Sequence, residues 1–294
     1  MIARRHVGVD GGATRCRARV RDADGCALGE ATGAAANIHV DFAAAVAIMR
    51  AVVSEALERA GIVDRGRIAI GFGLAGLNDA SDAERIISAF PGYALVRAAN
   101  DATTACIGAH AGADGGLVIA GTGSAAIARV AGAETIVGGR GFALGDDGSG
   151  AHIGLDALRA ATRAADGLAP GSPLTDGILD EFGSDVVAMV RWARAARPGD
   201  YGSFAPRAFD HAAAGDRIAL AIVASAARGI EALTRRVVAL GATRVALVGG
   251  VGEALRPYLD PEIAALLARP LYDAMDGAIL MTGGAVASAR EAAQ

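Results

Sequence analysis

Residues 117–130 read LVIAGTGSAAIARV and give the first indication of the fold. The apolar run 117–120 predicts a buried strand, Gly121, Thr122, Gly123 and Ser124 form a glycine turn, and residues 125–130 predict a second strand. A dinucleotide fingerprint of the form G-x-G-x-x-A must open a helix, which this turn does not do. A glycine hairpin between two antiparallel strands is instead typical of another kind of phosphate cradle.

The N-terminus has the same arrangement. A strand over residues 6–9 leads into Asp10, Gly11, Gly12, Ala13 and Thr14, and strands over 16–21 and 26–31 complete a predicted antiparallel meander. The two turns lie about 110 residues apart, which indicates an internal duplication. We therefore expect two similar α/β domains, covering residues 1–115 and 116–294.

Periodicity predicts the remaining elements. In the first half we expect helices over 41–60, 81–89 and 102–111 and strands over 67–75 and 94–99. In the more helical second half we expect strands over 135–137 and 241–248, and helices over 149–165, 173–182, 184–196, 204–214, 216–240 and 277–292.

The charged residues exclude several classes of protein. All 28 basic side chains are arginine, so a Walker phosphate loop, a protein-kinase lysine and Schiff-base chemistry are absent. A net charge of −4 with scattered arginines argues against nucleic acid as a partner. The three cysteines indicate neither a disulfide framework nor a zinc site. No targeting or membrane-spanning segment is predicted, so we expect a cytoplasmic protein with no membrane partner.

Two short motifs could carry chemistry. Gly11 and Gly12 allow backbone N–H groups to face an anion, the Thr14 hydroxyl can donate to a phosphate, and Asp10 can hold a hydrated Mg²⁺; the alternative is a plain β-turn. Asp101 lies where a strand ends and a helix begins, so it could accept a proton from an attacking hydroxyl. Its alternative role is an ordinary helix N-cap.

A glycine-rich segment over residues 138–150 reads GGRGFALGDDGSG. Its glycines allow close approach of the backbone to a ligand, and Asp146 and Asp147 could accept hydrogen bonds from sugar hydroxyls. The alternative is a flexible surface loop. Residues 245–250, VALVGG, end the predicted strand over 241–248 in two glycines, Gly249 and Gly250, which could let a nucleotide lie flat on the backbone, although this signal alone is unspecific.

The order of these motifs resembles the superfamily of actin, sugar kinases and heat-shock ATPases. The segment 138–154 looks like that of the N-acetylglucosamine kinase group, which also contains the activator ATPases of 2-hydroxyacyl-CoA dehydratases. Residues 198–206, PGDYGSFAP, and 36–38, ANI, are similar to bacterial glucosamine kinases. The resemblance implies an α/β fold of two ribonuclease-H-like (actin-like ATPase) domains with a cleft between them.

The resemblance also implies residue roles. Asp10 would organise Mg²⁺ and Asp101 would be the general base on the sugar 6-hydroxyl. The implied ATP contacts are Asp10, Gly11, Gly12, Thr14, Gly121, Thr122, Gly123, Gly215, Gly249 and Gly250. The implied sugar contacts are Asn37, Asp101, Ser124, Ala125, Gly139, Arg140, Gly141 and Asp146. The related kinases often carry Asn at the position of Ala125 and an aromatic residue at that of Arg140, which indicates a different sugar pocket.

We therefore predict an ATP- and Mg²⁺-dependent hexosamine kinase that forms glucosamine 6-phosphate from a small amino sugar, as a homodimer. One alternative is N-acetylglucosamine phosphorylation. A sugar-sensing regulator or ATPase activator would need a DNA-binding extension or cluster-binding cysteines, neither of which is predicted. A nicotinamide enzyme built on residues 121–123 is disfavoured by the strand that follows them.

Overall fold

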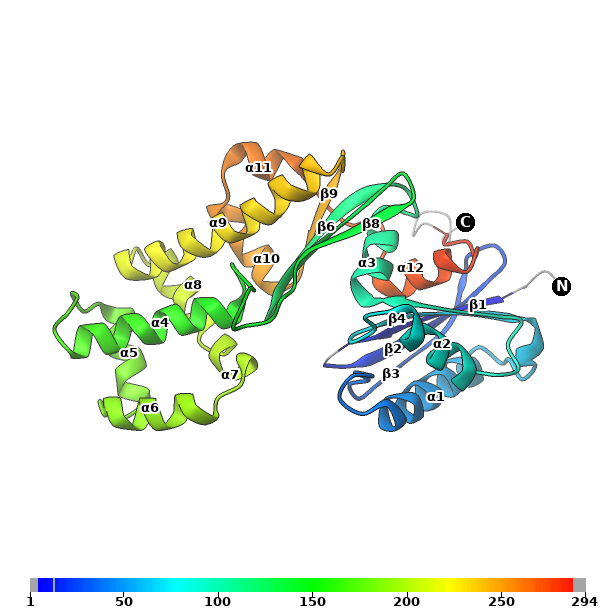
Figure 1. Ribbon diagram of the computed structural model, residues 1–294, viewed down its shortest axis with the longest axis horizontal. Coiled ribbons are helices and arrows are strands. Elements are labelled where there is room, and N and C mark those ends of the chain that lie inside the picture. Colours follow the sequence, from blue (N-terminus) through cyan, green and yellow to red (C-terminus); the bar gives the residue numbers. More distant parts are fainter. Residues whose placement is uncertain (1–4, 13, 288–294) are drawn as a thin grey trace. The chain divides into compact units, whose positions relative to one another are not determined.

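Two five-stranded sheets, one in each of two compact units, organise the computed structural model, which describes residues 5–12 and 14–287 (Figure 1). Within the described residues, unit 1 combines 5–12 and 14–115 with 269–287, and unit 2 is Gly116–Ala268. Helices accompany both sheets, so the predicted α/β class is confirmed.

The sheet of unit 1 has the strand order β3-β2-β1-β4-β5. Its strands are β1 (Arg5–Gly11), β2 (Cys16–Asp22), β3 (Ala27–Gly33), β4 (Ile68–Leu74) and β5 (Leu95–Asn100). The first three strands pair antiparallel, which confirms the predicted meander, while β4 and β5 run parallel to β1. Every residue of β4 is buried, as expected for a central parallel strand covered on both faces.

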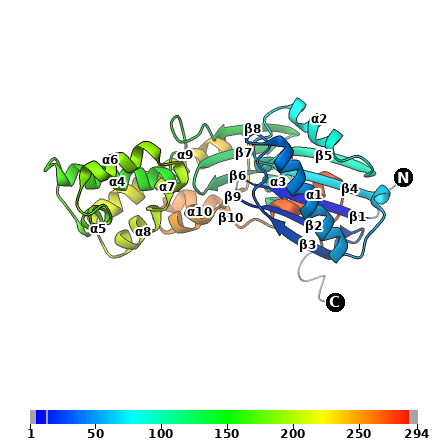
Figure 2. The same ribbon diagram turned by 90° about the horizontal axis from the view of Figure 1, so that it is seen from below.

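Helices cover both faces of this sheet. In Figure 2, α1 (Phe42–Arg59) lies in front of the first three strands, and it packs on β2 and β3. The short η1 (Arg65–Arg67) follows α1, and α2 (Ala80–Ala89) packs against β5. On the opposite face, α3 (Asp101–Ala109) and α12 (Ala274–Met281) pack against each other and against β4.

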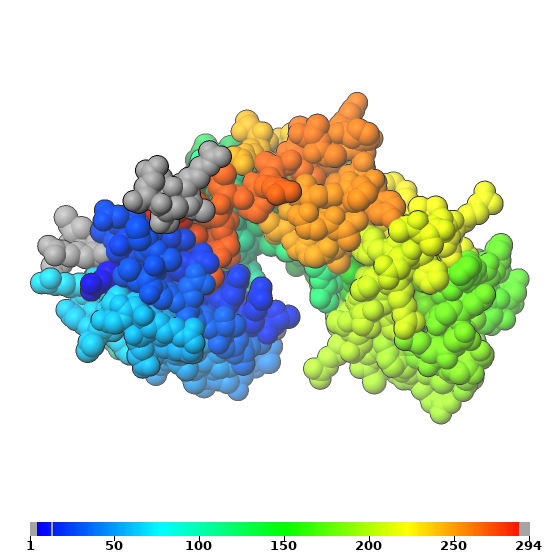
Figure 3. Space-filling model, turned by 180° about the vertical axis from the view of Figure 1, so that it is seen from behind, coloured from blue at the N-terminus to red at the C-terminus, as the bar shows by residue number. Residues whose placement is uncertain are grey.

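The C-terminal segment differs from its prediction. The closing helix is α12, which ends at Met281, so the predicted helix over 277–292 is confirmed over 277–281 and wrong over 282–287; residues 288–292 lie outside the described residues. The predicted second domain also ends too late, because residues 269–287 belong to unit 1. In Figure 3 the red C-terminal segment accordingly lies against blue N-terminal residues.

The close packing of α12 explains why the C-terminal segment belongs to unit 1. A Cβ atom on Gly8 would lie 1.9 Å from the backbone oxygen of Met275, and one on Gly277 would lie 1.8 Å from that of Thr104. Only glycine permits such backbone approach. The carboxylate of Asp276 then bridges two arginines of β2, at 2.9 Å from Arg19 and 2.8 Å from Arg21.

The sheet of unit 2 repeats the topology of unit 1. Its order is β8-β7-β6-β9-β10, with β6 (Gly115–Ala120), β7 (Ser124–Val130), β8 (Ala133–Gly138), β9 (Val245–Val248) and β10 (Leu267–Ala268). In each sheet the central strand pairs in parallel with a strand that comes later in the sequence. In unit 1 this pair is β1 and β4, and in unit 2 it is β6 and β9. The predicted duplication is therefore confirmed. The predicted strand 241–248 starts only at Val245, because Gly241, with φ of 101°, belongs to the preceding turn.

The helices of unit 2 include all five that the sequence predicts: α4 (Gly150–Ala165), α5 (Pro173–Glu181), α6 (Val186–Ala195), α8 (Ala205–Ala213) and α9 (Arg217–Ala239). Shorter elements were not predicted: α7 (Pro198–Gly202), α10 (Gly250–Leu255), η2 (Arg256–Tyr258), α11 (Pro261–Leu266) and β10. No helix within the described part of the chain is long and apolar enough to cross a membrane.

Candidate functional site

Asp10 lies near the end of β1, and the turn that follows is closed by the Gly12 N–H, which donates to the Arg15 oxygen at 3.0 Å. Gly11 packs closely against β4, since a Cβ atom there would lie 2.5 Å from Leu74 Cδ2 and would displace that side chain. Thr14 is exposed, and Ala13 lies outside the described residues. The Gly12 N–H therefore shapes the turn, contrary to the expectation that it faces an anion.

Arg17, which no sequence motif indicated, joins this turn. Its Nη2 lies 2.7 Å from Asp10 Oδ2. Its Nε is buried and has no hydrogen-bond partner among the described residues. The predicted hairpin could have indicated this residue, because a tight turn over residues 11–16 makes Arg17 the register partner of Asp10. Arg19 and Arg21, which alternate with it along β2, are instead bound to Asp276.

Asp101 is the first residue of α3, and the helix is capped by its neighbour. The Asn100 side chain accepts a hydrogen bond from Ala102 N at 2.9 Å, so the alternative role of Asp101 as the N-cap is wrong. Asp101 is half-buried, with Oδ1 accepting from Ala102 N at 2.8 Å. Burial raises the pKa of this carboxyl, and the negative charge of Asp10 raises it further. The two carboxylates thus belong to one edge of the sheet.

Asn37 belongs to the same edge. The N–H of Ala36 donates to the Gly12 oxygen at 3.3 Å, which ties this loop to the Asp10 turn. Asn37 Oδ1 accepts from His39 N at 2.9 Å and lies 2.6 Å from where a Cβ on Gly76 would be. Unit 1 therefore brings together its predicted residues Asp10, Gly11, Gly12, Asn37 and Asp101.

In unit 2 the glycine turn is bound to the start of α4. Gly121 N donates to Gly123 O at 2.9 Å, and the oxygens of Gly121 and Thr122 accept from Gly150 N and Ala151 N at 2.8 and 3.1 Å. The N–H groups of Thr122 and Gly123 make no hydrogen bond to the described residues, so they remain available to a ligand.

Gly249 and Gly250 lie against this turn. Gly249 has a φ of 100°, and a Cβ atom on it would lie 2.2 Å from the oxygen of Ala120, the residue before Gly121. Gly250 begins α10, and nothing lies within 4 Å of the position of its Cβ. The pairing of β6 with β9 therefore brings two glycine segments, far apart in the sequence, to one sheet edge.

The glycine-rich loop is held by Ser124. Its N–H donates to Asp146 Oδ1 at 3.3 Å, its hydroxyl donates to the Asp147 oxygen at 2.8 Å, and its oxygen accepts from Gly139 N at 3.1 Å. Asp146 has a φ of 64°, a left-handed conformation that a residue with a side chain seldom adopts. Ser124, Gly139 and Asp146 are thus brought together. Ala125 follows Ser124 in β7, and Arg140 and Gly141 lie exposed in the loop.

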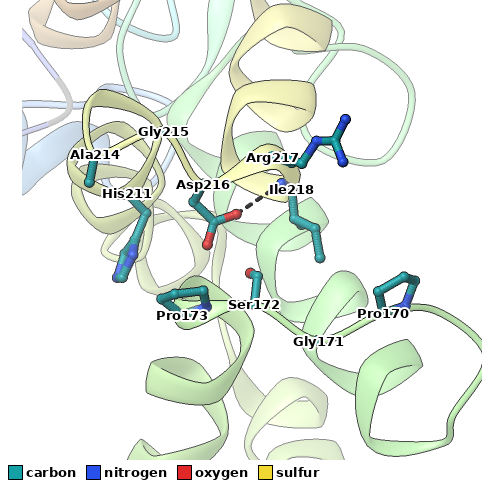
Figure 4. A pocket seen from close by; sticks show the side chains of 10 residues that line it. All are labelled: Pro170, Gly171, Ser172, Pro173, His211, Ala214, Gly215, Asp216, Arg217 and Ile218. Atoms are coloured by element: carbon teal, nitrogen blue, oxygen red, sulfur yellow. Dashed lines mark hydrogen bonds between the residues drawn. The ribbon is translucent and has the colours of Figure 1, made fainter.

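Gly215 lies in a different pocket of unit 2, of about 630 Å³ (Figure 4). None of the ten lining residues belongs to the glycine turn, to the glycine-rich loop or to α10. Beside Gly215, Asp216 caps α9 through Ile218 N at 2.9 Å and also accepts from Leu174 N at 3.0 Å. Burial opposes ionisation of Asp216, but these hydrogen bonds outweigh it and lower its pKa.

Two units with one strand order, each with a glycine turn after a central strand, define the class of actin-like ATPases with ribonuclease-H-like domains. More narrowly, the chain belongs to the BadF/BadG/BcrA/BcrD ATPase family, whose sequence profile matches residues 7–282. Members of the family use ATP, so the predicted ATP dependence agrees with it.

Three relatives illustrate the similarity. Glucosamine kinase GspK of Vibrio cholerae is 35% identical over 280 residues, covering 95% of each chain. The N-acetyl-D-glucosamine kinase of Dictyostelium discoideum is 27% identical, covering 79% of this chain and 78% of its own. A crystal structure from Chromobacterium violaceum, assigned provisionally as an N-acetylglucosamine kinase, has a TM-score of 0.86 at 35% identity, covering 95% of this chain and 99% of its own.

Proposed function

We propose that the protein is an ATP-dependent hexosamine kinase that transfers the γ-phosphoryl group of ATP to the 6-hydroxyl of glucosamine. The observation that carries the chemistry is Asp101, a half-buried carboxylate with a raised pKa beside Asp10. The sugar is inferred from the glucosamine kinase of Vibrio cholerae, which is similar over nearly the whole chain.

Asp101 acts as the general base. As the sugar O6 forms its bond to the γ-phosphorus, the bond from that phosphorus to the bridging oxygen breaks and ADP leaves. The proton of O6 passes to the carboxylate of Asp101. A pKa raised by burial and by Asp10 makes Asp101 a stronger base than an ordinary aspartate, which suits this transfer.

Backbone and hydroxyl donors hold the nucleotide. The free N–H groups of Thr122 and Gly123, with the Thr14 hydroxyl, are donors for phosphate oxygens. Arg17 offers the unpaired Nε beside Asp10. Residues Gly249 and Gly250 lie along the nucleotide, and the pocket of Gly215 is the proposed place for its base.

Asp10 fits the predicted Mg²⁺. Mg²⁺ in kinases is typically held by one or two carboxylates together with waters and substrate phosphates. Asp10 is half-buried, and its Oδ1 makes no hydrogen bond to the described residues. The described residues hold no cluster of three or more metal-ligating side chains, which agrees with a site completed by the nucleotide. An Mg²⁺ ion held there would neutralise charge on the phosphates.

The sugar is held by Asn37 and by the glycine-rich loop. The proposed contacts in unit 2 are Ser124, Ala125, Gly139, Arg140, Gly141 and Asp146. Asp146 contributes a carboxylate that can bind hydroxyls or the ammonium group of glucosamine. We further propose a homodimer in the cytoplasm; light scattering on the purified protein would test the dimer.

The test is a coupled assay of ADP release with glucosamine, N-acetylglucosamine, glucose and mannosamine. We expect the highest kcat/KM with glucosamine and formation of the 6-phosphate. A higher kcat/KM with N-acetylglucosamine would establish the second candidate, which the similarity to the Dictyostelium kinase favours. ADP release that none of the four sugars stimulates above the rate without sugar would refute the kinase assignment.

A further inference from the structure

A second polar pocket lies in unit 1, away from the residues discussed above. Its volume is about 390 Å³, and it is lined by Arg50, Ser54, Arg65, Ala89, Phe90, Pro91 and Tyr93. These residues come from α1, from η1, from the last residue of α2 and from the loop between α2 and β5. That loop precedes β5, whereas Asp101 follows its other end, so roughly 20 Å of strand separates the pocket from the proposed base.

The two arginines of this pocket are held by uncharged groups. Arg50 Nη2 donates to the Ala89 oxygen at 2.6 Å, and its guanidinium lies 5.8 Å from the ring centre of Phe90. Arg65 Nη2 donates to Ser54 Oγ at 3.1 Å, and its guanidinium lies 6.0 Å from the ring centre of Tyr93. Each guanidinium is therefore oriented through one nitrogen and one ring, and its other N–H groups stay available.

Neither arginine has a carboxylate partner in the described part of the chain. No acidic residue lines the pocket either. This differs from the neighbouring Arg59 and Arg85, which pair with Glu55 and Asp82. In a chain of net charge −4, two oriented and unneutralised cations at one pocket form a local site of positive potential.

We propose that this pocket binds a small phosphate monoester, with Arg50 and Arg65 as its charged ligands. Two guanidiniums offer the paired N–H donors that phosphate oxygens accept. The hydroxyl of Tyr93 makes no hydrogen bond to the described residues and adds a neutral donor, since burial raises its pKa despite the opposing effect of Arg65. The volume exceeds that of a bare phosphate, so the ester group is accommodated as well.

The test measures protection of single arginines from phenylglyoxal, which modifies guanidinium groups, by mass spectrometry of the full-length protein. ADP, Mg²⁺ and glucosamine are present throughout so that the proposed catalytic site is occupied. The probes are inorganic phosphate and glycerol 3-phosphate, with sodium chloride at equal ionic strength as the reference. We expect both probes to slow modification of Arg50 and Arg65 by about threefold or more at saturation, and glycerol 3-phosphate to act at the lower concentration.

Matched variants distinguish binding in this pocket from a general effect of phosphate on all arginines. Arg50→Gln should abolish protection of Arg65, whereas Arg59→Gln, which removes a paired arginine of the same helix, should leave it unchanged. Both variants should retain kinase activity, because neither residue belongs to the proposed site. Equal protection of Arg59, or protection of Arg65 that survives Arg50→Gln, would overturn the proposal. These outcomes are independent of which sugar the enzyme phosphorylates.

Discussion

Arg17 Nη2 lies 2.7 Å from Asp10 Oδ2, across the hairpin that joins β1 to β2. The pair is only partly exposed, with 25% of the Arg17 side chain and 17% of the Asp10 side chain accessible. A buried arginine N–H without an acceptor is costly, so the free Nε indicates a group that the protein alone does not supply. The phosphates of ATP are such a group under the proposed function.

Replacing Arg17 should weaken nucleotide binding. We expect Arg17→Met to raise the KM for MgATP by about tenfold or more, because a charge-assisted hydrogen bond contributes roughly 1.5–3 kcal/mol. Arg17→Lys should recover only part of this, since an ammonium group lacks the second nitrogen that spans Asp10 and a phosphate. Initial rates over a range of MgATP concentrations check the prediction. A KM for Arg17→Met within about twofold of the parent would contradict it.

Asp101→Asn should remove activity but keep sugar binding. We expect kcat to fall by about 100-fold or more, because the amide cannot accept the O6 proton. In the parent, kcat/KM should decline on acidification at a higher pH than for an ordinary aspartate, since the base must be ionised and its pKa is raised. Calorimetric titration with glucosamine checks binding. Turnover within tenfold of the parent would reject Asp101 as the base.

The same substitution should stabilise the fold. A carboxyl whose folded pKa is raised binds its proton more tightly in the folded state, so stability falls as pH rises from its ordinary pKa through the raised one. Asp101→Asn should therefore unfold at a higher temperature than the parent at pH 7.5, and the difference should vanish below pH 4. Thermal denaturation at both pH values checks this. An equal or lower midpoint at pH 7.5 would contradict it.

The segment 198–206, which contains Tyr201, should affect sugar binding through its contact with the glycine-rich loop. The Tyr201 ring lies 5.0 Å from the ring of Phe142, whose backbone oxygen accepts from His152 Nε2 at 2.9 Å. We expect Tyr201→Leu to raise the KM for sugar by about tenfold, because small displacements of positioning groups are costly. Tyr201→Phe keeps the ring and loses only the hydroxyl bond to Ala193, so its KM should stay near that of the parent. Equal KM values for both variants would exclude this role.

The sequence predicted the elements with strong periodicity and the internal duplication, because these depend on local patterns and on a short turn. It also selected Asp101, although the capping role belongs to Asn100. It did not place α12, whose contacts with Gly8 and Thr104 join residues far apart in the chain. The predicted segment 277–292 is rich in alanine and glycine, and such small residues carry little information about their packing partner.

The site was predicted unevenly for a related reason. Gly11 and Gly249 follow from turns after strands, a local signal. No local motif indicates Arg17, because the separate roles of Arg17 and Arg21 in β2 depend on partners from other segments, Asp10 and Asp276. The isolation of Gly215 from the glycine turn depends on how α8 and α9 pack, which no motif encodes.

The two adjacent glycines after β9, Gly249 and Gly250, allow a matched test of the sheet edge that they form with the glycine turn. Gly249→Ala should destabilise unit 2 by at least about 2 kcal/mol, because it forces a side chain into a left-handed conformation and against the Ala120 oxygen, 2.2 Å away. Gly250→Ala places a methyl group in open space at the start of α10, so its stability should differ little from that of the parent. Urea denaturation followed by circular dichroism measures both variants. If the two substitutions shift the midpoint equally, the close approach of Gly249 to β6 is not what fixes this edge.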